Sequence, residues 1–136
     1  MLFRSGQCDP GDCDAQREFF SLAPPADQQD AWKYRFLLDM DGNAFSGRFY
    51  AFLQSRSLTF KMAVFREWHE EWIKPRVHYI HLSLCGQEVL DSVRDIDVEE
   101  SGKLQRARMV EAGREWAKKA LRNEEIKVWF FRLLLE

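Results

Sequence analysis

The sequence predicts an α/β fold with a small parallel sheet, flanking helices and a helical C-terminus. The order of its apolar segments is strand, helix, strand, helix, strand and then helices, which is typical of a parallel α/β layer. The 136 residues are 46% apolar and 31% charged, and these values suit one domain with one modest core. We expect a loop-rich segment over residues 1–30 and a partial α/β domain over residues 31–136.

The first predicted strand covers residues 32–40. Before it we expect loop, with a short helical segment near residues 15–20 that Pro24 and Pro25 end. The strand is a short apolar-rich run, and Asp41, Gly42 and Asn43 form the turn signal that stops it.

A short helix and a second strand are predicted next. Ser46 is a candidate N-cap, and Phe49, Phe52 and Leu53 fall on one helical face that ends near Ser55. Residues 58–65 form the second strand candidate. A short helix is predicted over residues 67–72 and a third strand over residues 77–83, separated by Lys74-Pro75.

Beyond Gly86 the apolar residues recur at helical spacing. Three stripes share this pattern: Val89, Leu90 and Val93; Val110, Gly113, Trp116, Ala117, Ala120 and Leu121; and Ile126, Trp129, Phe130, Leu133 and Leu134. The aromatic stripes near the C-terminus predict core or a domain interface. Three strands are few for such a sheet and no stop signal follows the last helix, so we expect an incomplete chain.

Composition excludes several classes of function. The net charge is −2 with both signs mixed along the chain, which predicts neither a nucleic-acid groove nor a polybasic membrane anchor. The sequence contains no run of about 18 apolar residues, so it predicts no membrane-spanning helix. The first six residues lack the apolar stretch of a signal peptide.

The three cysteines allow more than one interpretation. Cys8 and Cys13 lie in an Asp/Gly/Pro-rich segment and are expected to form a disulfide in an oxidising compartment, or else to be free thiols. A zinc site would need two further ligands at similar spacing. Cys85 is expected to be a small buried hydrophobe.

The segment from residue 41 to residue 48 is the strongest candidate site. It leads from a strand into a helix start, where unpaired amide hydrogens and a partial positive charge attract phosphate. Gly42 and Gly47 let a ligand approach the backbone, Ser46 adds a hydroxyl, and Arg48 offers a guanidinium fork for a diphosphate. The alternative is an ordinary capped helix with a surface arginine.

The sequence supports a metal site or a catalytic histidine less well than it supports a phosphate-binding loop. Asp39 and Asp41 form an Asp-x-Asp pair, but no further oxygen ligands are identifiable, and both carboxylates are explained as strand-end and turn residues. His69, His78 and His81 are interpreted as structural. His78 and His81 would face opposite sides of a strand, which argues against a shared metal.

Residues 41–49 resemble the donor loop of glycosyltransferase family 90, the capsule-associated-protein family that includes protein O-glucosyltransferases and fungal xylosyltransferases. The resemblance extends over nearly the whole chain. It runs through Ser57-Leu58, Lys61, residues 65–70, Lys74-Pro75, residues 77–80, Ala112-Gly113, Trp116-Ala117 and residues 120–122, and it includes Cys8, Cys13 and their neighbours. The sequence departs from the family pattern at Met62-Ala63, Arg76 and His81.

This resemblance implies the Rossmann-like, C-terminal donor-binding half of a GT-B glycosyltransferase. The implied reaction transfers glucose or xylose from a UDP-sugar to a hydroxyl of a glycan or protein acceptor, with no metal and no other cofactor. The catalytic base would come from the N-terminal half, so this chain alone is expected to be inactive. The family also implies the secretory pathway, with a membrane-anchored full-length form.

The resemblance also assigns the site residues. The donor-binding residues it implies are Asp41, Gly42, Asn43, Ala44, Phe45, Ser46, Gly47 and Arg48. Lys61, Glu67 and His78 match the pattern as support, either orienting the ribose or bracing the loop. The alternative functions are a non-catalytic remnant or interaction module that keeps the fold, and a thiol or metal protein using Cys8 and Cys13.

Overall fold

The computed structural model describes residue 14, residue 18 and residues 27–42 and 44–135. The chain divides into two units, Met1–Ala31 and Trp32–Glu136, and the fold below concerns the second. The 3-10 helix η1 covers Gln28–Lys33 at the boundary. Of the expected helical segment near residues 15–20 only residue 18 is described, and the Cys8/Cys13 pair lies outside the described residues.

Three parallel strands form the sheet, in the order β1-β2-β3. They are β1 (Phe36–Met40), β2 (Leu58–Met62) and β3 (Ile80–His81). Phe36 pairs with Leu58 and Met40 with Met62, so the carboxyl ends of β1 and β2 are level. The predicted parallel α/β arrangement is therefore present, as a small sheet.

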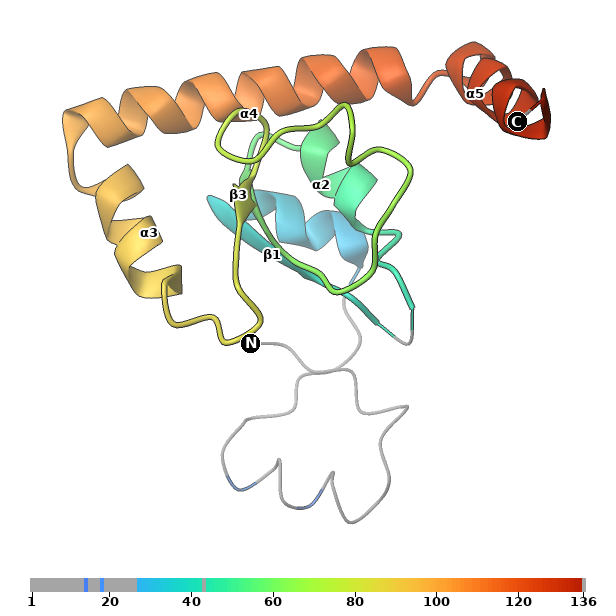
Figure 1. Cartoon of the computed structure of the whole chain (residues 1–136). Helices are drawn as coiled ribbons and strands as arrows, with labels where there is room; N and C mark the ends of the chain where they lie inside the picture. Colours follow the sequence, from blue (N-terminus) through green and yellow to red (C-terminus); the bar gives the residue numbers. More distant parts are fainter. Residues whose placement is uncertain (1–13, 15–17, 19–26, 43, 136) are drawn as a thin grey trace. The chain divides into compact units, whose positions relative to one another are not determined.

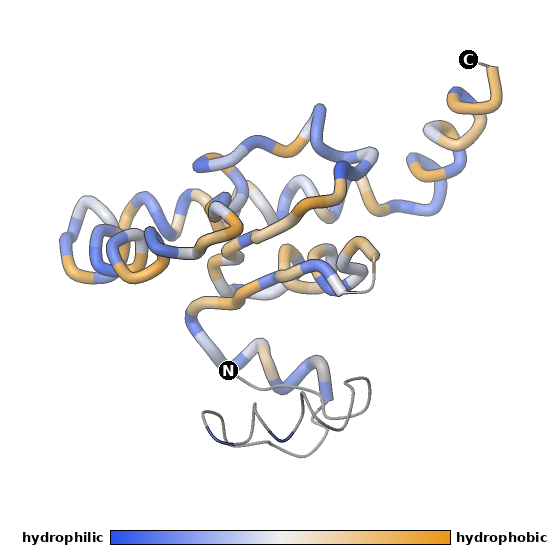
Figure 2. The backbone as a smooth tube through the Cα atoms, turned by 60° about the horizontal axis from the view of Figure 1, so that its bottom comes forward, coloured by the Kyte–Doolittle hydropathy of each residue, from blue (hydrophilic) through white to orange (hydrophobic). Residues whose placement is uncertain are grey.

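The helices are α2 (Phe49–Gln54), α3 (Val89–Asp97), α4 (Glu100–Ala120) and α5 (Asn123–Leu135). In the chain α2 lies between β1 and β2. Figure 1 shows the long α4 running past α2 and the strands. The three helical stripes predicted after Gly86 correspond to α3, α4 and α5 in order. Figure 2 shows apolar colouring along the strands and, separately, on parts of α5.

Two apolar clusters hold these layers together. One unites the sheet with α3 and α4, and its buried members are Leu58, Phe60, Ile80, Leu82, Ile96 and Met109. The other packs α2 against α4 and the segment before β3, and its buried members are Phe49, Leu53, Ile73, Tyr79 and Ala117. Phe49 belongs to the second cluster and is fully buried, so the core fixes the start of α2.

Two glycines of α4 allow close approach of its backbone to neighbouring segments. A Cβ at Gly102 would lie 2.0 Å from the carbonyl oxygen of Asp95, and one at Gly113 would lie 2.9 Å from the carbonyl oxygen of His78. Both distances are below any real contact of a Cβ atom. Gly102 therefore sets the α3–α4 corner, and Gly113 brings α4 onto the segment before β3.

The first strand begins later than predicted. Asp27 accepts the amide of Gln29 on its carboxylate, at 2.9 Å, and the amide of Asp30 on its carbonyl. These two bonds begin η1, which takes Trp32 and Lys33 out of the predicted strand. A local side-chain cap of this kind competes with extended structure.

The second strand ends at Met62 rather than at residue 65. One oxygen of the Asp41 carboxylate accepts the amides of Val64 and Phe65, at 2.6 and 3.1 Å. These bonds replace the sheet hydrogen bonds of both residues and turn the chain away from β2. Residues 67–72, predicted as a helix, form no regular helix; i→i+3 hydrogen bonds from the Glu70 amide to the Glu67 carbonyl and from the Trp72 amide to the His69 carbonyl close turns there.

The third strand is also shorter than predicted. The Lys74 amide donates to Nδ1 of His78 at 2.9 Å, and Arg76 adopts a left-handed φ of 62°. This turn occupies residues 74–79, so regular pairing is limited to Ile80 and His81, preceded by one bridge between Pro75 and Tyr79. Cys85, expected to be buried, is exposed in the turn that follows β3.

Candidate functional site

The predicted donor loop leaves the carboxyl end of β1 and enters α2 at Phe49. Asp41, Gly42 and residues 44–48 are described, whereas Asn43 lies outside the described residues. Ala44 is exposed, and Phe45 exposes 58% of its surface. In an open parallel sheet this edge is where ligands bind.

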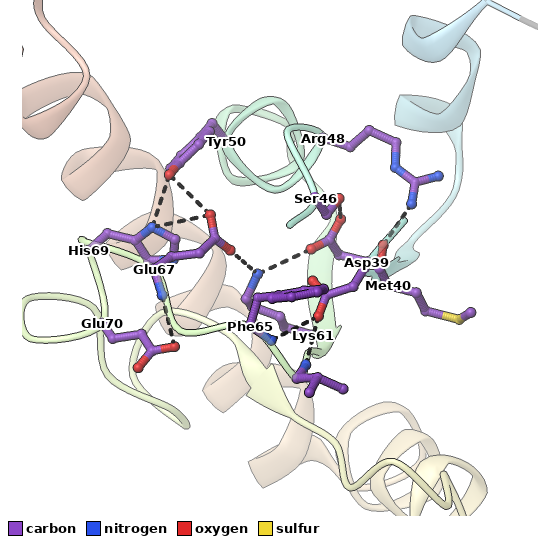
Figure 3. Close-up of polar contacts among 12 residues, drawn as sticks. Asp39, Met40, Ser46, Arg48, Tyr50, Lys61, Phe65, Glu67, His69 and Glu70 are labelled. Atoms are coloured by element: carbon purple, nitrogen blue, oxygen red, sulfur yellow. Dashed lines mark hydrogen bonds and ion pairs between the residues drawn. The ribbon is translucent and has the colours of Figure 1, made fainter. Parts of the chain in front are cut away.

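Ser46 is the buried anchor of this loop. Its hydroxyl donates a hydrogen bond of 2.5 Å to one oxygen of Asp39, which is fully buried on β1 (Figure 3). The prediction that Ser46 caps the helix is wrong: Arg48 holds the N-cap position, and no side chain caps α2. Because the Ser46 hydroxyl is bound to Asp39 on β1, it does not cap the amides at the start of α2.

Arg48 points to the end of β1. One guanidinium nitrogen, Nη2, donates to the carbonyl of Met40 at 2.9 Å, and the residue is exposed (Figure 3). A guanidinium has five N–H donors, so one bond to a carbonyl leaves others available. The positive charge of Arg48 is thereby fixed at the carboxyl edge of the sheet.

Gly42 and Gly47 have open space around them. A Cβ built at either would meet nothing within 4 Å, and neither has a positive φ. Within the described chain, neither internal packing nor backbone conformation requires a glycine at these positions. The space is suited to an external group that approaches the backbone.

Lys61 lies at the centre of a buried ionic network behind the loop. Its ammonium is 2.8 Å from Glu67 and 3.4 Å from Asp39, and it lies 4.2 Å from the ring centroid of Phe49. All three charged side chains are at most 5% exposed. Burial raises the pKa of Asp39, while the hydrogen bond from Ser46 and the charge of Lys61 oppose that shift.

The network continues from Glu67 to Tyr50 and His69. The Tyr50 hydroxyl donates to the second oxygen of Glu67 at 3.3 Å and lies 3.0 Å from Nδ1 of His69. Because Tyr50 has one hydroxyl hydrogen, donation to Glu67 makes Nδ1 of His69 the donor to Tyr50. Nε2 of His69 is then buried without a hydrogen-bond partner among the described residues.

Burial keeps the last two groups neutral. Burial and the neighbouring Glu67 charge raise the pKa of Tyr50 to about 12. Burial lowers the pKa of His69, although Glu67 opposes that shift. Sequence reasoning did not identify Tyr50, because nothing distinguishes it from other aromatic residues of a short helix.

The three expected support residues differ in their roles. Lys61 and Glu67 meet in the buried network and reach the loop through Asp39 and Ser46. Their side chains are at most 5% exposed, which favours bracing of the loop as their role. His78 instead bonds the Lys74 amide, and no hydrogen bond joins it to the described part of the loop. Burial lowers the pKa of His78.

The Asp39-x-Asp41 pair serves the fold. Asp39 is committed to Ser46 and Lys61, and Asp41 binds the amides of Val64 and Phe65 with one oxygen. The other oxygen of Asp41 is buried and has no partner within the described chain. Among the described residues, no group of three or more His, Cys, Asp or Glu could hold a metal ion.

Two cavities of similar size occur in the described part, and the predicted donor residues line neither. One, of about 350 Å³, is lined by Tyr50, Trp68, Leu121, Ile126 and Trp129. The Trp68 and Trp129 rings are 5.2 Å apart, so the aromatic stripe of α5 packs against residues before β3. The other, of about 320 Å³, lies beside the end of α4.

No helix in the described part is long and apolar enough to cross a membrane. The exposed apolar residues concentrate on α5 instead. Its more exposed members are Val128, Phe130, Phe131, Leu133, Leu134 and Leu135, each more than half exposed.

Comparison with known proteins gives one positive result. The sequence matches the family described as Glycosyl transferase family 90 over residues 13–136. Comparison with curated proteins found no match. The family match includes the β1–α2 loop, the buried network and all of α3, α4 and α5, and it supports a glycosyltransferase. Because the match covers far more than half of its residues, this chain belongs to glycosyl transferase family 90.

Proposed function

We propose that the chain binds the nucleotide diphosphate of a UDP-sugar at the loop from Asp41 to Arg48. The proposed reaction is transfer of a glucosyl or xylosyl group to a hydroxyl of a glycan or protein acceptor. The observation that carries the proposal is the position of Arg48, whose guanidinium is bound to the Met40 carbonyl at the carboxyl end of β1.

The surroundings of Arg48 favour an anionic ligand. Gly42 and Gly47 leave the backbone accessible, and the hydrogen bond from Ser46 to Asp39 ties this part of the loop to β1. A fixed guanidinium stabilises negative charge that develops on a leaving diphosphate, because its donors are already in place when the charge appears. The proposal requires no metal, so chelation by EDTA should leave UDP affinity unchanged.

The catalytic base is proposed to lie outside this chain. A general base must come within hydrogen-bond reach of the acceptor hydroxyl. The carboxylates at the loop are engaged: Asp39 and Glu67 are buried and bound to Lys61, and Asp41 accepts the amides of Val64 and Phe65. The isolated chain should therefore bind donor without releasing sugar from it.

A second candidate function is a non-catalytic interaction module. The observations that favour it are the exposed apolar residues of α5 and the absence of the described loop residues from the lining of both cavities. Such a module would keep the fold and would use its aromatic residues for partner contacts.

Calorimetric titration with UDP separates the two functions. The donor-binding chain should bind UDP, and Arg48→Ala should weaken binding by about tenfold or more, since charge-assisted hydrogen bonds contribute about 1.5–3 kcal/mol. Arg94→Ala is the matched control, because Arg94 is an exposed arginine of α3 that pairs with Asp91 on its own helix, at 3.6 Å. Equal affinity of the Arg48 and Arg94 variants would exclude the proposed site and favour the interaction module.

A further inference from the structure

The cavity beside the end of α4 has an unusual lining. It measures about 320 Å³, at the small end of ligand pockets. Its lining residues are Gln54, Arg114, Ala117, Lys118, Leu121 and Arg122. Three of these side chains are cationic and none is acidic. Figure 1 shows α2 and the C-terminal half of α4, which carry four of the lining residues, next to each other; Leu121 and Arg122 follow the end of α4.

The three cations are only partly neutralised by the protein. Arg114 gives one terminal nitrogen to Glu111 at 3.1 Å, but its Nε is buried and has no hydrogen bond within the described chain. Arg122 is 3.9 Å from Glu125. Lys118 is exposed, and among the described residues no ion pair or hydrogen bond holds its ammonium.

An oxyanion would complete this cavity. Arg114 and Lys118 are one helical turn apart, and like charges at that spacing destabilise a helix unless something neutralises them. The planar fork of a guanidinium matches two phosphate oxygens, and the Gln54 amide provides another donor. Ala117 and Leu121 add an apolar wall for the carbon part of a ligand.

This cavity lies apart from the proposed donor loop. The loop enters α2 at Phe49, whereas Gln54 is the last residue of the same helix, about 8 Å further along its axis. Because α2 connects two parallel strands, it runs from the carboxyl edge of the sheet back to the amino edge. The two anion sites would therefore lie at opposite edges.

We propose that the cavity formed by Gln54, Arg114, Lys118 and Arg122 binds a phosphate group, distinct from the diphosphate proposed at Arg48. The phosphate is carried by a small soluble molecule or by a lipid headgroup, since both present the same oxyanion. The basic residues that end α4 also complement the helix dipole, so the test must separate that role from ligand binding.

The experiment uses the full chain with Arg48→Ala as the background, which removes the donor loop from the measurement. Pyrophosphate is titrated into this protein and into the same protein with Lys118→Ala or Lys119→Ala. Lys119 is the matched control: it lies in the same last turn, is also exposed, and does not line the cavity. Both replacements change the charge and the helix dipole equally.

Pyrophosphate should bind the Arg48→Ala and Arg48→Ala/Lys119→Ala proteins with similar affinity. Lys118→Ala should weaken that binding by about tenfold or more, the loss of one charge-assisted contact. Equal affinity of the Lys118 and Lys119 variants overturns the proposal. If the parent does not bind UDP but the Lys118-dependent binding of pyrophosphate is observed, the donor proposal is wrong and the proposal for this cavity stands.

Vesicles distinguish the source of the phosphate. Phosphatidylcholine vesicles with and without phosphatidate are sedimented with the Arg48→Ala protein. Retention that needs both phosphatidate and Lys118 assigns the site to a lipid headgroup. Pyrophosphate binding without such retention assigns it to a soluble phosphate. If the Arg48→Ala protein fails to bind pyrophosphate and is also not retained by phosphatidate vesicles, the proposal is overturned.

Discussion

The hydroxyl of Ser46 donates a 2.5 Å hydrogen bond to the fully buried carboxylate of Asp39. Through this bond a residue of the exposed loop is joined to the ionic network in the core. Lys61 lies between Asp39 and Glu67, and Glu67 accepts from Tyr50 on α2. The network therefore reaches both ends of the loop, β1 before it and α2 after it.

Lys61→Met should destabilise the fold by about 3–5 kcal/mol, because it leaves the carboxylates of Asp39 and Glu67 buried without their cation. Urea unfolding measures the change. Lys119→Met removes an exposed lysine of α4 and should stay within about 0.5 kcal/mol of the parent. A Lys61 variant as stable as the Lys119 variant would show that the network contributes nothing to stability.

Ser46→Ala should cost about 1–3 kcal/mol of folding stability, since a buried oxygen of Asp39 loses its donor. It should also lower UDP affinity, because the loop that carries Arg48 loses its anchor. Ser101→Ala, on the exposed first turn of α4, is the control for both measurements. Unchanged UDP affinity in the Ser46 variant would show that donor binding does not depend on the hydrogen bond between Ser46 and Asp39.

Gly47→Ala should leave the unfolding free energy within about 0.5 kcal/mol of the parent, because a Cβ there meets nothing within 4 Å. UDP affinity should fall, since the methyl group enters the space proposed for the ligand. Gly102→Ala should instead severely reduce the unfolding free energy, because a Cβ there would lie 2.0 Å from the Asp95 carbonyl oxygen. If Gly47→Ala binds UDP as tightly as the parent, the ligand does not approach this backbone.

Stability should fall as the pH drops below about 6.5, the ordinary pKa of histidine. Burial lowers the pKa of His69 in the folded chain, so the unfolded chain takes up a proton first. The stabilisation is present above the unfolded pKa and is lost as the pH falls toward the folded pKa. His78 acts in the same direction.

Thermal unfolding of His69→Asn across this pH range checks the prediction. Asn places an amide donor near the Tyr50 hydroxyl but cannot gain a proton, so the variant should show a shallower pH dependence than the parent. His81→Asn, at an exposed position of β3, should keep the parent dependence. Identical slopes for His69→Asn and the parent would contradict the assignment to His69.

The parts of the fold that follow local patterns could be predicted from the sequence. The α2 stripe of Phe49, Phe52 and Leu53 is buried as expected, and the three C-terminal helices follow their apolar spacing. The errors occur where a side chain takes a backbone group. Asp27 and His78 do so close in sequence, whereas Asp41 does so at long range. Asp41 ends β2 by binding Val64 and Phe65, twenty-three and twenty-four residues away.

The candidate site residues could be proposed from the sequence, but the contacts they make could not. A loop rich in Gly and Ser before Arg48 indicates phosphate from local sequence alone. That Ser46 bonds Asp39, or that Lys61 is shared between two carboxylates, depends on the register that places Asp39 opposite Lys61 in the sheet. The cationic cavity at Gln54 was also missed, because its residues come from two helices far apart in the sequence.

Amide and arginine side-chain NMR spectra of the labelled chain, recorded during UDP titration, test the donor site most directly. UDP should shift the amide signals of Gly42, Gly47 and Phe49 and the Nε signal of Arg48, and Arg48→Ala should abolish these shifts. Saturating UDP that leaves these signals unmoved, or that shifts only residues around Trp68 and Trp129, would contradict binding at the end of β1.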